Sequence, residues 1–293
     1  MYEIKRFDFT PILGWSNTRY DIFISCKRQY YYQYYSKYDP VYKKWQIDSL
    51  KQMTSIPMEI GSIVHDVIET LLNRLKKTEE KINEDRFYEY ALRKTQEYCR
   101  KKEFSELFYM EIDRVDEDEI YDDVKTCLDN FLNSERFTWL SEEAISNKAS
   151  WIIEPAGYGE TRIDGMKAYC KVDFLFPIDD KIYIMDWKTG KKVFEKHSKQ
   201  LKGYSAWASY HFSKSPNDVI PTIAYLRPKY EENEIVYNEF DLEEFSNQVQ
   251  NETKEMYSFC KDINENIPED KEKFVKTPNK LYCDYCNYRK LCN

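Results

Sequence analysis

Two aspartates and a lysine flank one short turn in a way that could build a metal-dependent site. Between Met166 and Lys188, two runs rich in β-branched and aromatic residues surround Asp179-Asp180, which has the composition of a hairpin turn. If these two residues form the turn, Asp173 pairs with Asp186. Side chains alternate along a strand, so Lys188 shares the face of Asp186. Two carboxylates this close repel each other, and a divalent cation bound between them would offset that repulsion.

The apolar surroundings of this hairpin bear on whether it forms a metal site. A hairpin whose charges face water is the usual alternative, and a turn shifted by one residue would spoil the pairing. However, the neighbouring side chains are apolar or aromatic: Val172, Phe174, Phe176, Ile182, Ile184, Met185 and Trp187. Charges at the end of a buried strand are costly unless they are paired or bound to a metal. The hairpin alone leaves both interpretations open.

This pattern resembles the PD-(D/E)XK nuclease superfamily and is most similar to its RecB-like branch, which includes exonucleases of CRISPR adaptation. The lone Asp173 and the strand-borne Asp186-x-Lys188 of DWKTGK match the family's catalytic motif, although Val172 stands where the family has a proline. The resemblance implies a restriction-endonuclease-like α/β fold, in which helices flank a mixed β-sheet core.

Two predicted helices extend the resemblance. GSIVHDVIE, from Gly61 to Glu69, is similar to the family's Gly-x-x-x-His helix, and apolar residues recur around it at helical spacing. KQLKGYSAWA contains Gln200 and Tyr204, four residues apart, and is similar to the family's Gln-x-x-x-Tyr helix. Without the resemblance, the alternatives are a structural His65 and an ordinary helix surface packed on the sheet.

The resemblance implies a set of site residues. The metal ligands are His65, Asp173, Asp186 and the backbone carbonyl of Trp187, and the catalytic residues are Asp173, Asp186, Lys188, Gln200 and Tyr204. Hard oxygen ligands favour Mg²⁺ or Mn²⁺, and the imidazole gives a modest preference for Mn²⁺ over Mg²⁺. The ion would activate a water, while Lys188 would hold that water or stabilise the charge that develops on phosphorus.

A second group of potential ligands lies near the C-terminus. Cys283, Cys286 and Cys292 form the pattern C-x-x-C-x-x-x-x-x-C. Two thiolates separated by two residues, as in Cys283 and Cys286, can bind the same metal ion. Four-cysteine sites hold either zinc or an iron–sulfur cluster, and spacing alone leaves both open. The resemblance supplies Cys26 as the fourth ligand and a [4Fe–4S] cluster as the cofactor, with zinc as the alternative. We interpret the other four cysteines as small core side chains.

The elements that must position these groups follow from hydrophobic periodicity. We expect a helix over residues 15–38 that begins near Ser16 and carries Cys26, a histidine helix over 59–76, and a helical region over 84–147. Strands are expected near 150–156, 167–177, 181–188 and 219–228, with the Gln200 helix between the last two. A long amphipathic helix from Glu239 leads to the cysteines. We interpret residues 1–293 as a single nuclease domain, with a helical insertion at about 77–148 and an iron–sulfur clasp formed by 281–293 with Cys26.

Charge and composition bear on the substrate and the compartment. The formal net charge of the 293 residues is −8, but lysines flank the candidate site, and phosphate contacts need only a local positive potential. We predict that Lys191, Lys192, Lys196 and Lys199 bind nucleic acid, with an ordinary solvated face as the alternative. No apolar run could span a membrane, and the N-terminus has no signal-peptide pattern, so we expect a cytoplasmic protein with no membrane partner.

Two hypotheses about function remain. The first is a metal-dependent DNA nuclease, specifically an exonuclease on single-stranded DNA ends, with a recombination helicase or a CRISPR integrase as partner. The second is a nucleic-acid-binding or scaffold subunit of a repair, recombination or CRISPR-adaptation complex, with weak or partner-dependent cleavage. The complete set of Asp173, Asp186 and Lys188 favours the first, because a scaffold has no need of all three. The sequence contains no P-loop pattern, so it carries no P-loop motor.

Overall fold

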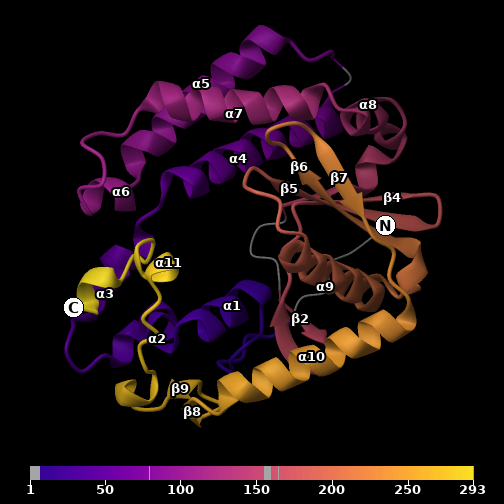
Figure 1. Cartoon of the computed structure of the whole chain (residues 1–293). Coiled ribbons are helices and arrows are strands. Elements are labelled where there is room, and N and C mark those ends of the chain that lie inside the picture. Colours follow the sequence, from indigo (N-terminus) through magenta and orange to yellow (C-terminus); the bar gives the residue numbers. More distant parts are fainter. Residues whose placement is uncertain (1–6, 79, 155–159, 164, 293) are drawn as a thin grey trace. The chain divides into compact units, whose positions relative to one another are not determined.

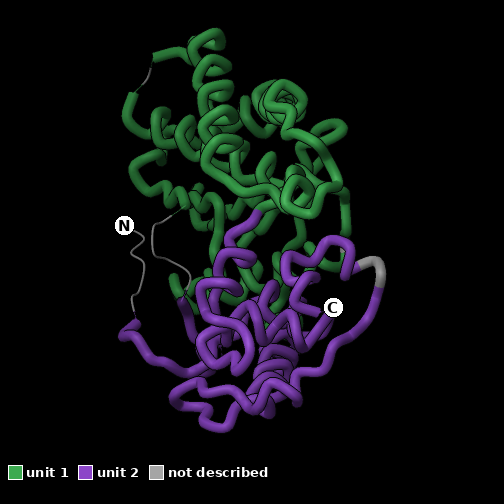
Figure 2. The backbone as a smooth tube through the Cα atoms, turned by 90° about the vertical axis from the view of Figure 1, so that its left-hand side faces the viewer, with its two compact units in different colours: residues 1–5, 54–159, 170–242 green, residues 6–53, 160–169, 243–293 purple. Residues whose placement is uncertain are grey.

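The computed structural model describes residues 7–78, 80–154, 160–163 and 165–292. The chain divides into two compact units, drawn in different colours in Figure 2. The first consists of residues 1–5, 54–159 and 170–242, and the second of residues 6–53, 160–169 and 243–293. Within the described ranges, no helix is long and apolar enough to cross a membrane. The single-domain interpretation and its insertion stay predictions.

A five-stranded mixed sheet forms the centre of the first unit (Figure 1). Its strands are β1 (Ile152–Ile153), β4 (Phe174–Ile178), β5 (Lys181–Lys188), β6 (Val219–Tyr225) and β7 (Glu231–Glu234). They lie side by side in this order, and β5 and β6 run parallel while the other neighbours run antiparallel. A parallel pair needs a long crossover connection, and here α9 (Phe194–Phe212) provides most of it.

The hairpin of β4 and β5 has the predicted register. Ile178 pairs with Lys181 and Phe174 with Met185, which leaves Asp179-Asp180 as the two-residue loop. Because antiparallel pairing is symmetric about the turn, the same register continued by one residue brings Asp173 opposite Asp186.

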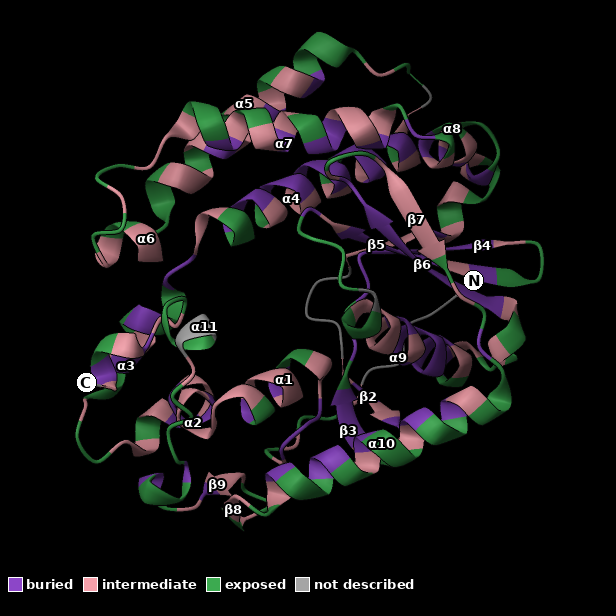
Figure 3. Cartoon of the chain, in the orientation of Figure 1, coloured by how far each residue is buried: buried purple, intermediate pink, exposed green. Residues whose placement is uncertain are grey.

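Helices flank the sheet, as the fold class predicted. The remaining helices of the first unit are α4 (Ile56–Lys77), α5 (Glu84–Lys101), α6 (Ser105–Phe108), α7 (Glu117–Leu132), α8 (Glu135–Glu142) and the 3₁₀ segments η2 (Ala144–Ser150) and η3 (Pro216–Asp218). Side chains alternate along a strand, so Phe174 and Phe176 lie on the same face of the sheet. There they pack with Met185 and Trp187 in an apolar core that includes α4 and α7. The face that carries Asp186 meets α9 instead. Figure 3 shows how completely β6, between its neighbours, is buried.

The sequence of α4 explains its length and its buried face. Pro57 stands in the first turn, where a missing N–H costs nothing. Basic residues occupy the last turn and complement the helix dipole. Between them, apolar residues recur every three or four positions and are buried: Ile60, Ile63, Val64, Val67, Ile68, Leu71, Leu72 and Leu75. This stripe fixes the rotation of α4 about its axis, and with it the direction of His65.

The second unit contains the long helix α10, several shorter helices and two small hairpins. Its elements are α1 (Asn17–Ser25), α2 (Lys27–Tyr35), η1 (Ser36–Tyr38), α3 (Lys44–Gln52), β2 (Glu160–Ile163), β3 (Met166–Tyr169), α10 (Glu239–Tyr257), β8 (Cys260–Asp262), β9 (Ile267–Pro268), η4 (Lys271–Lys273), α11 (Lys280–Cys283) and η5 (Arg289–Leu291). The first turn of α10 belongs to the first unit. Buried tyrosines of α2, such as Tyr31 and Tyr35, pack around Phe274. Aromatic packing thus forms much of this core.

Three predicted elements differ from the structure. The helix expected over 15–38 begins after Ser16 as predicted, but it is interrupted at Cys26, whose φ of −158° and ψ of 114° are extended. The strand expected over 167–177 is two strands, because β3 pairs with β2 in a separate sheet while β4 joins the central one. The helix from Glu239 ends at Tyr257, after which Cys260–Asp262 forms a hairpin strand.

Candidate active site

His65 reaches the central sheet from the middle of α4. Its Nε2 lies 3.0 Å from the carbonyl oxygen of Trp187, and its Nδ1 lies 3.4 Å from Oδ2 of Asp173. Gly61 lies one turn earlier, and a Cβ at that position would come within 3.3 Å of Oγ1 of Thr189. The glycine therefore allows the helix to approach the segment after β5, and the histidine four residues later points at the same region.

Asp173 and Asp186 face each other across the hairpin. Asp173 lies directly before β4 and Asp186 lies within β5, and their exposed fractions are only 8% and 2%. Oδ2 of Asp173 accepts a hydrogen bond of 3.0 Å from the backbone N–H of Trp187. The indole of Trp187 packs on Phe131 in the core, with ring centroids 5.1 Å apart. The backbone of Trp187 thus contacts the site while its side chain anchors the strand.

Three side chains hold Asp186 in place. The hydroxyl of Tyr204 donates to Oδ1 of Asp186 at 2.7 Å, and the amide of Gln200 donates to the same oxygen at 3.1 Å. The ammonium of Lys188 contacts Oδ2. Gln200 and Tyr204 are one turn apart on α9, so both reach one carboxylate. The structure therefore brings together all five residues that we predicted to be catalytic.

The charges of this site are strongly coupled. Burial raises the pKa of Asp186 above its ordinary value, and the charge of Asp173 raises it further, against the opposing effect of Lys188. Burial also acts to raise the pKa of Asp173, but His65 and Lys188 outweigh it and hold this pKa below its usual range. Burial disfavours the imidazolium of His65, yet the charge of Asp173 and the other carboxylates holds its pKa well above the usual value. A bound cation would relieve this concentration of negative charge.

Glu154 completes the group, although we did not predict it from the sequence. Its Oε1 lies 3.5 Å from Nδ1 of His65, and its Oε2 accepts a hydrogen bond of 3.0 Å from Lys171. It directly follows β1, and its backbone N–H donates to the carbonyl of Asp173 at 2.9 Å. In the sequence WIIE, Glu154 is a carboxylate at the end of an apolar run. The same signal pointed to Asp186, so it could also have identified Glu154.

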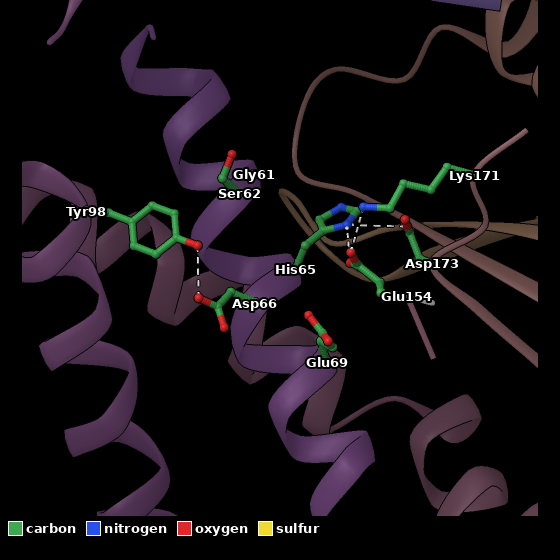
Figure 4. A pocket seen from close by; sticks show the side chains of 9 residues that line it. All are labelled: Gly61, Ser62, His65, Asp66, Glu69, Tyr98, Glu154, Lys171 and Asp173. Atoms are coloured by element: carbon green, nitrogen blue, oxygen red, sulfur yellow. Dashed lines mark hydrogen bonds and ion pairs between the residues drawn. The ribbon is translucent and has the colours of Figure 1, made fainter. Parts of the chain in front are cut away.

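A pocket of about 530 Å³ lies beside these residues. Figure 4 shows His65, Glu154 and Asp173 pointing toward one another on its wall, with Lys171 next to Glu154. Ligand atoms of the first three lie within 4.8 Å of one another. Two carboxylates and one imidazole form a donor set that suits a divalent cation such as Mg²⁺ or Mn²⁺. Asp186, which we predicted as a ligand, is not a member of this group of three.

The four lysines predicted to bind nucleic acid follow β5. Lys191 and Lys192 lie in the segment before α9, and Lys196 and Lys199 lie on its first two turns. Three are exposed, and Lys199 is half-buried. Lys192 forms an ion pair of 3.2 Å with Glu231 of β7. Their contact with nucleic acid stays a prediction.

The four predicted cluster ligands line one pocket of the second unit, of about 240 Å³. Cys26 lies between α1 and α2, Cys283 ends α11, and Cys286 and Cys292 lie in the turns that follow. Burial raises the pKa of the Cys286 thiol to about 11, with smaller contributions from the charges of the other three cysteines. We predicted that Cys26 lies on a continuous helix, and this was wrong, because Cys26 has extended backbone angles and separates α1 from α2.

Comparisons with known proteins bear on the identity of this arrangement. The solved structure of an Eubacterium rectale protein, provisionally described as an exonuclease, has a TM-score of 0.49 at 12% identity over 94% of this chain and 87% of that one. The structure of SSO0001 has a TM-score of 0.30 at 16% identity over 64% of this chain and 77% of that one. No curated protein matches. Among protein families, the PD-(D/E)XK nuclease superfamily matches residues 14–293, a range that contains the hairpin, α4, α9 and all four pocket cysteines. The chain belongs to the PD-(D/E)XK nuclease superfamily.

Proposed function

We propose that this protein is a metal-dependent deoxyribonuclease that acts as an exonuclease on single-stranded DNA ends. The observation that carries the proposal is the convergence of His65, Glu154 and Asp173 beside the Asp186–Lys188 contact. A scaffold protein has no use for a buried pair of carboxylates, because burying such charges destabilises the fold. Exonuclease action and single-strand preference come from the sequence resemblance.

The residues present are suited to hold a divalent metal ion. His65, Glu154 and Asp173 would bind it. The carbonyl oxygen of Trp187 lies 3.0 Å from Nε2 of His65, and Asp186 stays a predicted ligand. Such an ion supplies positive charge to the scissile phosphate and acidifies a bound water. Metal binding must displace the proton from His65, so metal affinity should increase with pH.

Lys188 is the residue we assign to the reacting phosphate. Asp186 and Asp173 hold its pKa above the ordinary value although burial opposes this, so the ammonium stays charged. Its contact with Asp186 fixes the ammonium at the edge of the site. From there it can hold the attacking water or stabilise the charge that develops on a phosphate oxygen. Tyr204 and Gln200 act through Asp186, because they hydrogen-bond that carboxylate.

The test is cleavage of end-labelled single-stranded and double-stranded DNA, with Mg²⁺ or Mn²⁺ present or removed by chelation. We expect metal-dependent release of short products from single-stranded ends. Lys188→Ala should lower the rate by roughly 10³-fold and leave metal affinity nearly unchanged, because a transition-state contact is lost.

Lys181→Ala is the matched control, since Lys181 is an exposed lysine at the start of the same strand. It should cleave like the parent protein. Equal cleavage by Lys188→Ala and Lys181→Ala would remove Lys188 from the mechanism. No cleavage by the parent with either metal would favour the scaffold hypothesis, in which a helicase or integrase partner is required.

We further propose that the cysteine pocket holds a [4Fe–4S] cluster, with zinc as the alternative. Support comes from the four cysteines that line one pocket, because Cys26 lies far in the sequence from Cys283, Cys286 and Cys292. Burial keeps the thiols of Cys286 and Cys292 protonated in the free protein, so binding must release protons. Protein purified without oxygen should be brown and contain iron and sulfide. A colourless protein with one tightly bound zinc would establish the alternative.

A further inference from the structure

One short segment of this acidic protein is strongly basic. Residues 27–52 contain six basic and two acidic side chains, a net charge of +4, in a chain whose formal net charge is −8. The segment forms α2, η1 and α3 of the second unit. It contains none of the lysines near the nuclease site. Such a local reversal of charge is the electrostatic footprint of a polyanion-binding surface.

The structure gathers part of this charge around one hollow. A cavity of about 460 Å³ is lined by Lys37, Lys44 and Lys51, together with polar and aromatic groups: Gln33, Tyr34, Ser36, Asp48 and Gln52. Its lining combines carbon surface with cations and hydrogen-bonding groups. A ligand for this hollow should therefore be anionic and carry hydrogen-bonding edges.

The two acidic groups of the segment do not cancel this field. Asp48 is already engaged by Lys44 and by the hydroxyl of Ser36, which donates at 2.8 Å. Asp39 is paired with the buried ammonium of Lys271 at 2.6 Å. Among the described residues, no carboxylate lies within 4.0 Å of the ammonium of Lys37 or Lys51. The ammonium of Lys51 donates to the backbone carbonyl of Gln33 at 2.8 Å and feels the charge of Asp48 only from farther away. Two positive charges are thus available to an incoming anion.

An exposed tryptophan stands next to the hollow. Trp45 is 66% exposed, although tryptophan is among the side chains that gain most from burial. It lies on α3 three residues before Asp48 and seven before Gln52, so helical spacing puts it on the face that lines the hollow. Inside the hollow, the ring of Tyr34 is held by the guanidinium of Arg19, 4.2 Å from the ring centroid. One aromatic ring is free to stack, and a second is fixed in the wall.

We propose that Trp45, Lys37 and Lys51 form a second nucleic-acid site, which binds a single strand outside the nuclease centre. An unpaired base would stack on the indole of Trp45 while neighbouring phosphates contact the lysines. Duplex DNA keeps its bases stacked inside, so the indole selects for single strands. The proposal rests on the proposed function only in that the strand is taken to be the enzyme's substrate.

Binding of a fluorescein-labelled oligothymidylate to the whole protein, followed by anisotropy in EDTA, tests the site without cleavage. Trp45→Ala should raise the Kd roughly tenfold. Its matched control is Phe9→Ala, because Phe9 is another exposed aromatic residue of the same unit and does not line the hollow. On an abasic oligonucleotide, Trp45→Ala and the parent should bind equally, because no base is present to stack.

The lysines are tested by salt dependence. Replacing Lys37 and Lys51 by Gln should reduce the slope of log K against log[salt] by about 1.4, or 0.7 for each phosphate contact. The control pair is Lys254→Gln with Lys261→Gln, two exposed lysines of the same unit outside the hollow. Unchanged affinity and slope in all the hollow variants would overturn the proposal. So would Trp45-dependent binding to phosphatidylserine vesicles without any effect on DNA, which would indicate a membrane surface instead.

The two proposals can fail separately. Trp45→Ala should raise the Kd in EDTA by the same factor in a Lys188→Ala background as in the parent, because the two residues belong to different units. Trp45→Ala should hydrolyse bis(4-nitrophenyl) phosphate, a small phosphodiester, at the parental rate. A parent protein that binds DNA through Trp45 but never cleaves would retain the second site and refute the nuclease.

Discussion

The carboxylate site of the first unit and the cysteine pocket of the second unit are built in different ways. In the carboxylate site, His65 lies in the middle of a long helix and Asp186 lies within a central strand. Hydrogen bonds between side chains, such as that from Tyr204 to Asp186, already fix the geometry. In the cysteine pocket, the candidate ligands lie at a break between helices, at the end of a four-residue helix, and in turns.

The two sites therefore differ in what holds their side chains in place. The carboxylate site is held by the packing of α4, β5 and α9, so its residues are preorganised by the fold. The segment that carries Cys283, Cys286 and Cys292 has only a four-residue helix, turns and a short 3₁₀ segment, so it gains most from a bound group that links its cysteines. We therefore expect changes in the first region to affect activity, and changes in the second to affect stability.

The largest expected effect is on activity, from Asp186→Asn. The variant removes the charge that holds the ammonium of Lys188, so cleavage should fall roughly 10³-fold or more. Burial raises the pKa of Asp186, which means that the charged form is disfavoured in the folded state, so the loss of charge should not lower the unfolding midpoint much. Cleavage rates and thermal unfolding of the same preparation measure both.

Asp180→Asn is the control in the same hairpin, because Asp180 is fully exposed at the turn. It should leave both rate and midpoint unchanged. If Asp186→Asn unfolded the protein while Asp180→Asn did not, the carboxylate site would be structural, and the contrast between the two regions would disappear.

The next effect is on stability, from Cys286→Ser. A cluster that joins Cys26 to the C-terminal cysteines closes a very long loop, and its binding free energy becomes folding free energy. Loss of one ligand should lower the unfolding midpoint by roughly 10 °C and bleach the protein. Calorimetry of protein handled without oxygen, with iron analysis, provides the measurement.

Cys260→Ser is the matched control, since Cys260 belongs to the same unit but does not line the pocket. It should retain iron and colour. Direct contacts also join the two ends of this unit, such as the hydrogen bond of 3.3 Å from Tyr32 to the carbonyl of Leu291. Should Cys286→Ser prove as stable as the parent, these contacts and not a cluster would hold the ends together.

Local patterns in the sequence were sufficient for the nuclease hairpin. Alternation has a period of two, so one correct turn at Asp179-Asp180 determines every pairing, including that of Asp173 with Asp186. The apolar spacing around Gly61 to Glu69 likewise predicted the helix that the structure shows as α4. The cap at Ser16 follows the same logic, because its hydroxyl accepts a hydrogen bond of 3.1 Å from the N–H of Arg19.

Features that depend on distant pairing were not predicted. The segment 167–177 reads as one strand, yet Ala168 is bridged to Trp15 and its strand pairs with β2, which no local pattern reveals. Glu154 was overlooked because its link to His65 depends on how β1 lies beside β4. The strand β7 was not predicted because its sequence, EENE, has no apolar residue.

Glu154→Gln tests the ligand that only the structure identified. The amide keeps the shape but removes the charge next to His65, so affinity for Mn²⁺ should fall roughly 10- to 100-fold with little change in stability. Titration calorimetry of metal-free protein measures it. Glu69→Gln, which alters another wall of the same pocket, should have a clearly smaller effect. Equal losses would mean that the pocket attracts the cation through its general charge and that Glu154 is not a ligand.

The smallest effect should come from Tyr204→Phe, because it removes one hydrogen bond and no charge. Tyr204 is buried and donates to Asp186 at 2.7 Å, while Gln200 still donates to the same oxygen in the variant. A hydrogen bond to a charged group is worth about 1.5 kcal/mol at the lower end, so cleavage should fall about tenfold. Tyr237→Phe is the control, since its hydroxyl donates to the carbonyl of Ser198 on the same helix at 3.1 Å. If Tyr204 positions Asp186, its loss should lower the rate at saturating metal, whereas Tyr237→Phe should change only stability. Equal rates in the two variants would show that β5 alone fixes Asp186, and that the preorganisation of this site comes from the strand and not from α9.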